Sequence, residues 1–223
     1  MVKVKICGIT NSDDAVSACA YGADLIGFVF IEGTPRGVDK LNVKNIIKDI
    51  DVNSSRSGVK VGLFKDENKE KVSDIAVYCG LDCVQLQGEE SPEYCRELKA
   101  MVKDERGRDI EIIKAFKVKD EILSHGMYVP ADYVDADYFV FDTFNPDISG
   151  GTGEIFDWEV LKREVVSLKK PFFVAGGLNP GNVQDAIKVM LPYGVDVSSG
   201  IERKKGMKDV ELLKEFIQNA KIT

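Results

Sequence analysis

Histidine is almost absent from this chain of 223 residues, in which His125 is the only one. A metal site that uses several histidines is therefore excluded, and no metal is expected. Long apolar runs are also absent, because no stretch approaches the roughly 18 residues that a membrane-spanning helix needs. The N-terminus leads directly into an expected strand, so neither a membrane span nor a signal peptide is expected.

A surplus of positive charge is likewise lacking. The 30 basic and 37 acidic side chains give a formal net charge of −7, which argues against a nucleic-acid-binding face. Apolar residues make up 44% of the chain and charged residues 30%, as in ordinary soluble globular proteins. The length suits one well-buried α/β domain over residues 1–223 and is short for two.

The cysteines do not form a disulfide framework. Their number is odd and no two have C-x-x-C spacing; they are Cys7, Cys19, Cys79, Cys83 and Cys95. Most of them lie inside an expected strand or helix, or at the end of one. Buried, reduced thiols in a cytoplasmic protein are therefore the expected state.

Short apolar runs alternate with helical patterns along the chain. The runs are continuous, which is typical of strands that are covered on both faces and therefore parallel. Eight strands are expected, at residues 1–6, 25–30, 59–64, 83–86, 111–116, 138–141, 172–175 and 195–197. Helices are expected near residues 12–21, 43–50, 68–79, 92 onward, 119–126, 157–168, 179–191 and 207–220. Eight strand–helix units in one domain favour a (β/α)8 TIM barrel over an open doubly wound sheet.

Glycine-bearing turns follow the last three expected strands. They are Gly150-Gly151-Thr152-Gly153, Gly176-Gly177 and Ser198-Ser199-Gly200. Glycine lets backbone N–H groups approach a ligand closely, although it also simply permits a tight turn. Three such turns at the carboxyl ends of successive strands favour a site for an anion, and phosphate is the anion they suit best.

Two strand ends carry groups that could move protons. Cys7 ends the first strand, where its thiol would face the barrel mouth and act as a base or nucleophile if positive charge surrounds it. An inert core thiol is the alternative, and position alone does not decide. Asp142 ends the sixth strand, where an aspartate is ordinarily a cap or turn residue. Apolar surroundings from Phe139, Phe141 and Phe144 would instead raise its pKa and let it donate a proton.

Arg36 is a third candidate, on the loop after the second strand. Most loop arginines are simply solvated, but Pro35 stiffens this loop and a guanidinium can bind a substrate carboxylate through two hydrogen bonds. A thiol and a carboxyl on separate strands suit proton removal at one atom and proton delivery at another. The set is closer to an aldose–ketose isomerisation or enolisation site than to a nucleophilic triad, for which the histidine is lacking.

Taken together, the motifs are far more specific than any one of them. In chain order they are Lys5-Ile6-Cys7-Gly8-Ile9-Thr10, Phe28-Val29-Phe30 with Pro35-Arg36, Val61-Gly62-Leu63-Phe64, Val84-Gln85-Leu86-Gln87-Gly88, Phe141-Asp142-Thr143, Gly150-Gly151-Thr152-Gly153, Ala175-Gly176-Gly177-Leu178 and Val195-Asp196-Val197-Ser198-Ser199-Gly200-Ile201-Glu202. From residue 3 to about residue 209, the chain closely resembles the phosphoribosylanthranilate isomerase family of tryptophan biosynthesis.

The resemblance implies a cofactor-independent Amadori rearrangement of N-(5-phosphoribosyl)anthranilate to 1-(2-carboxyphenylamino)-1-deoxyribulose 5-phosphate. By analogy, Asp142 would be the general acid at the furanose ring oxygen, and Cys7, as a thiolate, the general base at carbon-2 of the sugar. Arg36 would hold the anthranilate carboxylate. The phosphate would be held by Gly176, Gly177, Ser199 and Gly200. The implied partner is this small phosphosugar, and the chain would act as a monomer or a homodimer.

One position departs from the family, which usually has histidine where this chain has Gln87; glutamine cannot titrate near neutrality. Two other enzymes of the same scaffold are alternatives. A metal-dependent epimerase needs histidine ligands, and indole-glycerol-phosphate synthase would need a lysine acid such as Lys114 or Lys65 and would leave Cys7 without a role. A non-catalytic phospho-ligand-binding protein is a further alternative, because a barrel alone does not imply catalysis.

Overall fold

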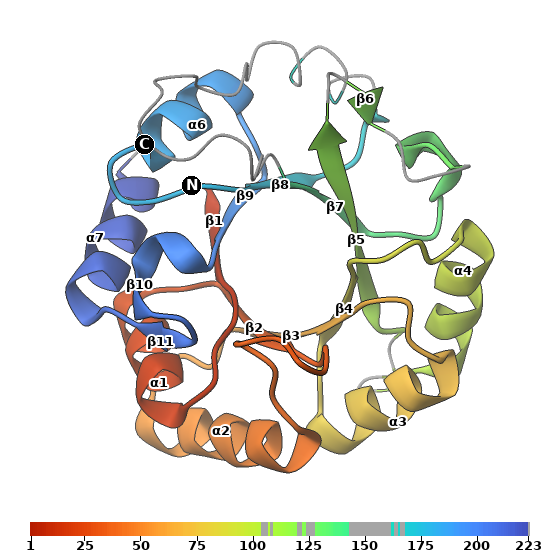
Figure 1. Cartoon of the computed structure of the whole chain (residues 1–223), viewed down its shortest axis with the longest axis horizontal. Helices are drawn as coiled ribbons and strands as arrows, with labels where there is room; N and C mark the ends of the chain where they lie inside the picture. The colour runs from red at the N-terminus through yellow and green to blue at the C-terminus, as the bar shows by residue number, and fades with distance from the viewer. Residues whose placement is uncertain are drawn as a thin grey trace.

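Eight parallel strands form a closed ring in the computed structural model, which describes residues 1–103, 107, 109–119, 122–123, 128–142, 162, 165 and 168–222. Going round the ring, the strands are β1 (Lys3–Ile6), β2 (Leu25–Val29), β3 (Val59–Phe64), β4 (Cys83–Leu86), β5 (Glu111–Lys119), β7 (Tyr138–Asp142), β8 (Phe172–Ala175) and β9 (Gly194–Val197). Pairing of β9 with β1 closes it. The predicted (β/α)8 barrel is therefore confirmed (Figure 1).

The helices lie outside the ring of strands (Figure 1). They are α1 (Ser12–Tyr21), α2 (Lys40–Asn53), α3 (Lys69–Cys79), α4 (Pro92–Met101), α6 (Val183–Met190) and α7 (Val210–Lys221). Their ends are encoded locally, as α3 illustrates. The side chain of Asn68 accepts hydrogen bonds from the first turn, and Gly80 ends the helix with a φ of 68°. None of the helices in the described ranges is long and apolar enough to cross a membrane.

Four of the expected helices need correction. The helix expected at 43–50 is longer and covers Lys40–Asn53. The helix expected at 207–220 begins at Val210, because Met207–Lys208 forms strand β11 and pairs with β10 (Glu202–Lys204). The helix expected at 179–191 begins at Val183, because side chains of the preceding segment hydrogen-bond its backbone into a turn. The helix expected at 119–126 is wrong where the chain is described: β5 continues to Lys119 and pairs with β6 (Ile122–Leu123). His125, the turn at 150–153 and most of the helix expected at 157–168 lie outside the described residues.

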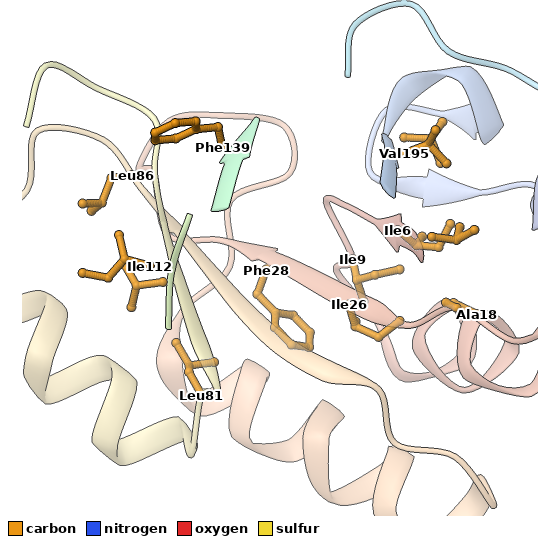
Figure 2. Packing of buried hydrophobic residues seen from close by; sticks show 14 of the residues in the cluster. Ile6, Ile9, Ala18, Ile26, Phe28, Leu81, Leu86, Ile112, Phe139 and Val195 are labelled. Carbon is orange, nitrogen blue, oxygen red and sulfur yellow. The ribbon is translucent and has the colours of Figure 1, made fainter. Parts of the chain in front are cut away.

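The strands bury both of their faces, because alternate side chains point to opposite sides of the ring. Outward-facing residues pack against the helices in one large cluster, where Figure 2 shows Ile6 and Ile26 beside Ala18 of α1. Inward-facing apolar residues form a smaller cluster, which contains Leu25, Val61, Cys83, Ile113, Ala115, Val140, Phe173 and Ala175. All five cysteines are buried and free, as predicted.

The last helix returns to the start of the first strand. The Lys221 ammonium, at the end of α7, donates to the carbonyl oxygen of Val2 at 3.2 Å and also contacts Asp24. The two ends of the chain therefore lie together at the amino-terminal side of the barrel, opposite to the carboxyl ends of the strands.

A buried ion pair fixes the loops that follow β3 and β4. Lys114, on the outward face of β5, is fully buried, and its ammonium lies 2.7 Å from a carboxylate oxygen of Glu90. Glu90 also accepts hydrogen bonds from the backbone N–H groups of Asp66 at 2.8 Å and Gly88 at 3.1 Å. A carboxylate with so many buried donors organises its surroundings, and losing one partner leaves the others without compensation.

We therefore expect Lys114→Met to lower the free energy of unfolding by about 3–5 kcal/mol, because Glu90 would remain buried without its cation. Urea denaturation followed by circular dichroism measures the loss. The matched control is Lys188→Met, which removes an exposed pair with Asp185 and should cost less than about 1 kcal/mol. Equal losses in the two variants would contradict the interpretation.

Candidate active site

A cavity of about 500 Å³ lies at the carboxyl ends of the strands. The turn predicted at 150–153 lies outside the described residues. The cavity lining contains the other predicted site residues, which are Cys7, Arg36, Asp142, Gly176, Gly177, Ser199 and Gly200. Gln87, the position that departs from the family, also lines it. The fold therefore brings together residues that are up to 193 positions apart in the chain, from Cys7 to Gly200. This is the end of the barrel at which enzymes of this architecture place their active sites.

The turns after β8 and β9 border the cavity with glycine and serine residues, among them Gly176, Gly177, Ser199 and Gly200. Gly176 and Gly177 have φ values of 93° and 64°, which favour glycine. At Gly200, a Cβ atom would lie 1.8 Å from the carbonyl oxygen of Leu178, so no side chain fits without moving the backbone. Asn182 supports the first turn by donating to the carbonyl oxygen of Gly177 at 3.0 Å. Backbone this close to a cavity suits an anionic group.

Cys7 follows the last residue of β1 and lines the cavity, although its side chain is largely buried. Its N–H donates to the carbonyl oxygen of Val197 at 2.8 Å, which continues the pairing with β9. Gly8 has a φ of 72°, and a Cβ there would lie 2.6 Å from Cδ of Arg36. A glycine at this position therefore lets the guanidinium side chain pass close to the cysteine.

The thiol of Cys7 experiences two opposing influences. Burial raises its pKa above the usual value, because a thiolate loses solvation there. The positive charges of Lys5 and Lys208 lower it, while the carboxylate of Asp196 adds to the increase. The net direction is upward. A free thiolate is therefore expected to become more abundant as the pH rises above neutrality.

Arg36 is held by a carboxylate of the protein itself. Its Nε and Nη2 atoms donate to the two carboxylate oxygens of Glu202, each at 2.7 Å. Lys208 donates to the same carboxylate at 3.1 Å, and to the carbonyl oxygens of Cys7 at 2.6 Å and Ser198 at 3.0 Å. A guanidinium has five N–H donors, so the two bonds to Glu202 leave donors that can point at a ligand.

Asp142 is the last residue of β7 and is half-buried at the cavity wall. The prediction that Phe139 and Phe141 surround its carboxyl is wrong, because these rings face the helices. There Phe139 makes an edge contact with Phe116, and Phe141 stacks on Phe116. The alternation of side chains along the strand explains this: Val140 and Asp142 share the inward face. Phe144 lies outside the described residues.

Polar groups lie at the cavity floor and directly beneath it, where Lys5 is fully buried. The amide of Gln85 donates to that of Gln87 at 2.8 Å, and the ammonium of Lys5 lies 2.8 Å from Oδ2 of Asp196. Oε1 of Gln85 and Oδ1 of Asp196 are buried and accept no hydrogen bond from any described residue. Because neither oxygen atom is accessible to solvent, both lie beneath the surface of the cavity and not on it.

The family model of N-(5′-phosphoribosyl)anthranilate isomerase matches residues 4–219 of the chain. The chain belongs to this family.

Individual relatives agree with the family over the full length. The N-(5′-phosphoribosyl)anthranilate isomerase of Pelobacter propionicus is 40% identical over 223 residues, which cover 100% of this chain and 97% of the relative. A structure of monomers of the dimeric isomerase from Thermotoga maritima has a TM-score of 0.81 and 35% identity. A family structure in complex with reduced 1-(o-carboxyphenylamino)-1-deoxyribulose 5-phosphate has a TM-score of 0.81 and 36% identity. Both structural matches cover 100% of each chain.

Several polar residues of this isomerase-family site were not singled out from sequence. Lys5 and Asp196 each interrupt an apolar strand between two buried aliphatic residues, and that pattern of a charge at an inward position was the available signal. Glu202 and Lys208 gave no such signal, because the hairpin that carries them was expected as loop and helix. Their roles depend on contacts with segments more than 160 residues away, as the 166-residue separation of Arg36 and Glu202 illustrates.

The ion pairs of Glu202 should make the free energy of unfolding depend on pH in the acidic range. Burial alone would raise the pKa of Glu202, but hydrogen bonds from Arg36 and the charge of Lys208 hold it below its usual value. Its ionised form therefore stabilises the fold at neutral pH, and this contribution is lost as the pH falls through the folded-state pKa. We expect Glu202→Gln to be less stable than wild type at pH 7, with the difference shrinking below about pH 4.

Urea denaturation at several pH values between neutral and acidic measures this difference. The control is Glu215→Gln, at an exposed position of α7, which should follow the wild-type pH dependence. A deficit in Glu202→Gln that stays constant down to the acid limb would contradict the assignment.

Proposed function

We propose that the chain converts N-(5-phosphoribosyl)anthranilate to 1-(2-carboxyphenylamino)-1-deoxyribulose 5-phosphate, with Asp142 as general acid and Cys7 as general base. One observation carries the proposal: a single cavity is lined by a thiol, a carboxyl, a guanidinium and two glycine turns. The substrate has the complementary features, which are two proton-transfer positions on the sugar, a carboxylate at one end and a phosphate at the other.

In the first step, the carboxyl of Asp142 gives its proton to the furanose ring oxygen. The bond between that oxygen and carbon-1 breaks, and the nitrogen lone pair forms a protonated Schiff base with carbon-1. Asp142 suits this role because it stands at the inward-facing end of β7, at the cavity wall. A positioned acid contributes roughly 10²–10⁴-fold to such a step.

In the second step, the thiolate of Cys7 takes the proton from carbon-2. The electrons of that C–H bond form a double bond between carbon-1 and carbon-2, and the iminium electrons return to nitrogen. The enolamine then tautomerises: its hydroxyl loses a proton, carbon-1 gains one, and the ketone results. Strands β9 and β8 separate β1 from β7 in the ring, so the base and the acid approach the sugar from different sides.

Binding of the two anionic ends falls to different parts of the cavity. We assign the anthranilate carboxylate to the guanidinium donors of Arg36 that remain after Glu202 is bound. We assign the phosphate to the turns at Gly176, Gly177, Ser199 and Gly200, whose backbone borders the cavity. No step requires a metal or a cofactor.

Gln87 occupies the position at which the family usually has histidine, and its side chain cannot titrate near neutrality. Its carbonyl oxygen accepts from Gln85 at 2.8 Å, which turns its amide nitrogen, a donor, away from that bond. We infer that Gln87 contributes a hydrogen-bond donor to the substrate and takes no part in proton transfer.

The alternative of an indole-glycerol-phosphate synthase is not favoured by the position of its required lysine. Lys114 is buried on the outward face of β5 against Glu90, and Lys65 is exposed outside the cavity lining.

We also propose a cytoplasmic protein with no nucleic-acid partner. A monomer and a homodimer suit the site equally, because the described lining residues come from one chain.

Replacement of the proposed acid or base should abolish most turnover without unfolding the barrel. We expect Cys7→Ser and Asp142→Asn each to lower kcat by roughly 10²–10⁴-fold. The fluorescence decrease of freshly generated phosphoribosylanthranilate measures the rate. Cys19→Ser is the matched control, because this cysteine is buried in α1 outside the cavity. Wild-type turnover in Asp142→Asn would remove the acid assignment, and binding of the reduced product analogue without turnover in wild type would favour a non-catalytic protein.

Arg36→Met should act chiefly on substrate binding. Loss of a charge-assisted contact to the carboxylate is expected to raise KM by roughly tenfold or more, with a smaller effect on kcat. The same fluorescence assay over a range of substrate concentrations separates the two parameters. An unchanged KM would place the carboxylate elsewhere.

A further inference from the structure

Lys5 is a fully buried lysine inside the barrel, directly below the floor of the cavity. Its side chain has 0% exposure, and its ammonium lies 2.8 Å from Oδ2 of Asp196. Asp196 itself lines the cavity and is 7% exposed. This pair connects the neighbouring strands β1 and β9, in which Lys5 and Asp196 are register partners, and it lies on the same face of β1 as Cys7.

The ammonium of Lys5 and the sulfur of Cys7 border the same small space. A Cβ atom on Gly27 of β2 would lie 3.0 Å from the Cys7 sulfur and 3.3 Å from the Lys5 ammonium nitrogen. Because β2 has no side chain at this position, the two groups share the space that a side chain would fill. The interior of the barrel thus places a cation beside the thiol, where little water can screen it.

Packing alone gives no reason for charges in this place. Other inward positions of the barrel are filled by apolar residues such as Val61, Ile113 and Phe173. Burying a lysine and an aspartate costs solvation that their mutual attraction rarely repays, and apolar residues of similar volume are often as stable or more so. A pair retained at this cost, next to the proposed base, points to a role in its chemistry.

We propose that Lys5 is a positioning residue whose ammonium stabilises the thiolate of Cys7, and that Asp196 holds Lys5 in place. The inference rests on the proposed role of Cys7 as the base that takes the proton from carbon-2. Lys5 itself does not touch the substrate.

Lys5 is one of several charged groups near Cys7 that affect the pKa of its thiol. Asp196 of β9 faces the thiol with negative charge, while Lys208 of β11 and Arg36 face it with positive charge. Burial raises the pKa of Cys7, and among the charges that lower it, Lys5 has the largest effect. Removing Lys5 would therefore raise this pKa further, and the pH at which the base becomes active would rise with it.

The test measures alkylation of Cys7 by iodoacetamide as a function of pH, without substrate, with mass spectrometry of the Cys7 peptide. In Lys5→Met, we expect the midpoint of the reaction to move upward by roughly one pH unit or more, which is the scale for loss of a nearby opposite charge. In the pH profile of kcat/KM, the limb that follows the titration of Cys7 should move by the same amount. An unchanged midpoint in Lys5→Met would overturn the proposal.

Lys114→Met is the matched control for this experiment. It removes another fully buried strand lysine from a carboxylate, but on the outward face of β5. It should share the loss of stability and keep the wild-type midpoint for Cys7. If both variants shift the midpoint equally, the effect is structural and the proposal fails.

A reciprocal measurement applies even if Lys5→Met does not fold. The charge of the Cys7 thiolate raises the pKa of Lys5, so Cys7→Ala should make Lys5 titrate at lower pH, by linkage. Nitrogen-15 NMR of the lysine ammonium groups follows this titration in wild type and Cys7→Ala. Identical Lys5 titrations in the two proteins would refute the coupling.

These readouts also separate this inference from the proposed function. The alkylation and NMR experiments need no turnover, so a shifted midpoint together with an active Cys7→Ser would keep the coupling and reject Cys7 as the base. An unshifted midpoint together with an inactive Cys7→Ser would reject the coupling and keep Cys7 as the base.

Discussion

The carboxylate of Glu202 is the group on which the geometry of the cavity depends. It binds the guanidinium of Arg36 through both oxygens and also accepts from Lys208, which in turn donates to the carbonyl oxygens of Cys7 and Ser198. One buried anion thus connects the loop after β2, the end of β1, the turn after β9 and the hairpin of β10 and β11. Since these groups have little contact with water, each relies on the others for its hydrogen bonds.

Strands were predicted well because each is a short apolar run whose burial on both faces is visible in the sequence. The expected bounds of β3, β4 and β8 agree with the structure. The hairpin at 202–208 was not predicted, because it is held by distant groups: Thr10 donates to the carbonyl oxygen of Gly206, and Lys208 donates to that of Cys7. A helical pattern near the C-terminus extended the expected helix over these residues, and tertiary contacts overrode it.

The candidate site could be located from sequence because a barrel gathers all its strand ends at one place. Cys7 and Asp142 needed only that rule to be brought together. What the sequence did not provide was the environment of each group. Asp142 was expected among phenylalanines that in fact face the helices, and no protein carboxylate was predicted to bind Arg36, whereas Glu202 does. Such details depend on which face a side chain takes and on partners far along the chain.

The meeting of the chain ends beneath the barrel has a consequence for architecture. Lys221 contacts the backbone of Val2, and Figure 1 shows the N and C marks near each other. Because the first strand starts and the last helix stops on the side away from the cavity, a polypeptide fused to either end would extend from the rear of the molecule. In such a fusion, small molecules would still reach the cavity. A covalent connection between the two ends would likewise leave the cavity unchanged.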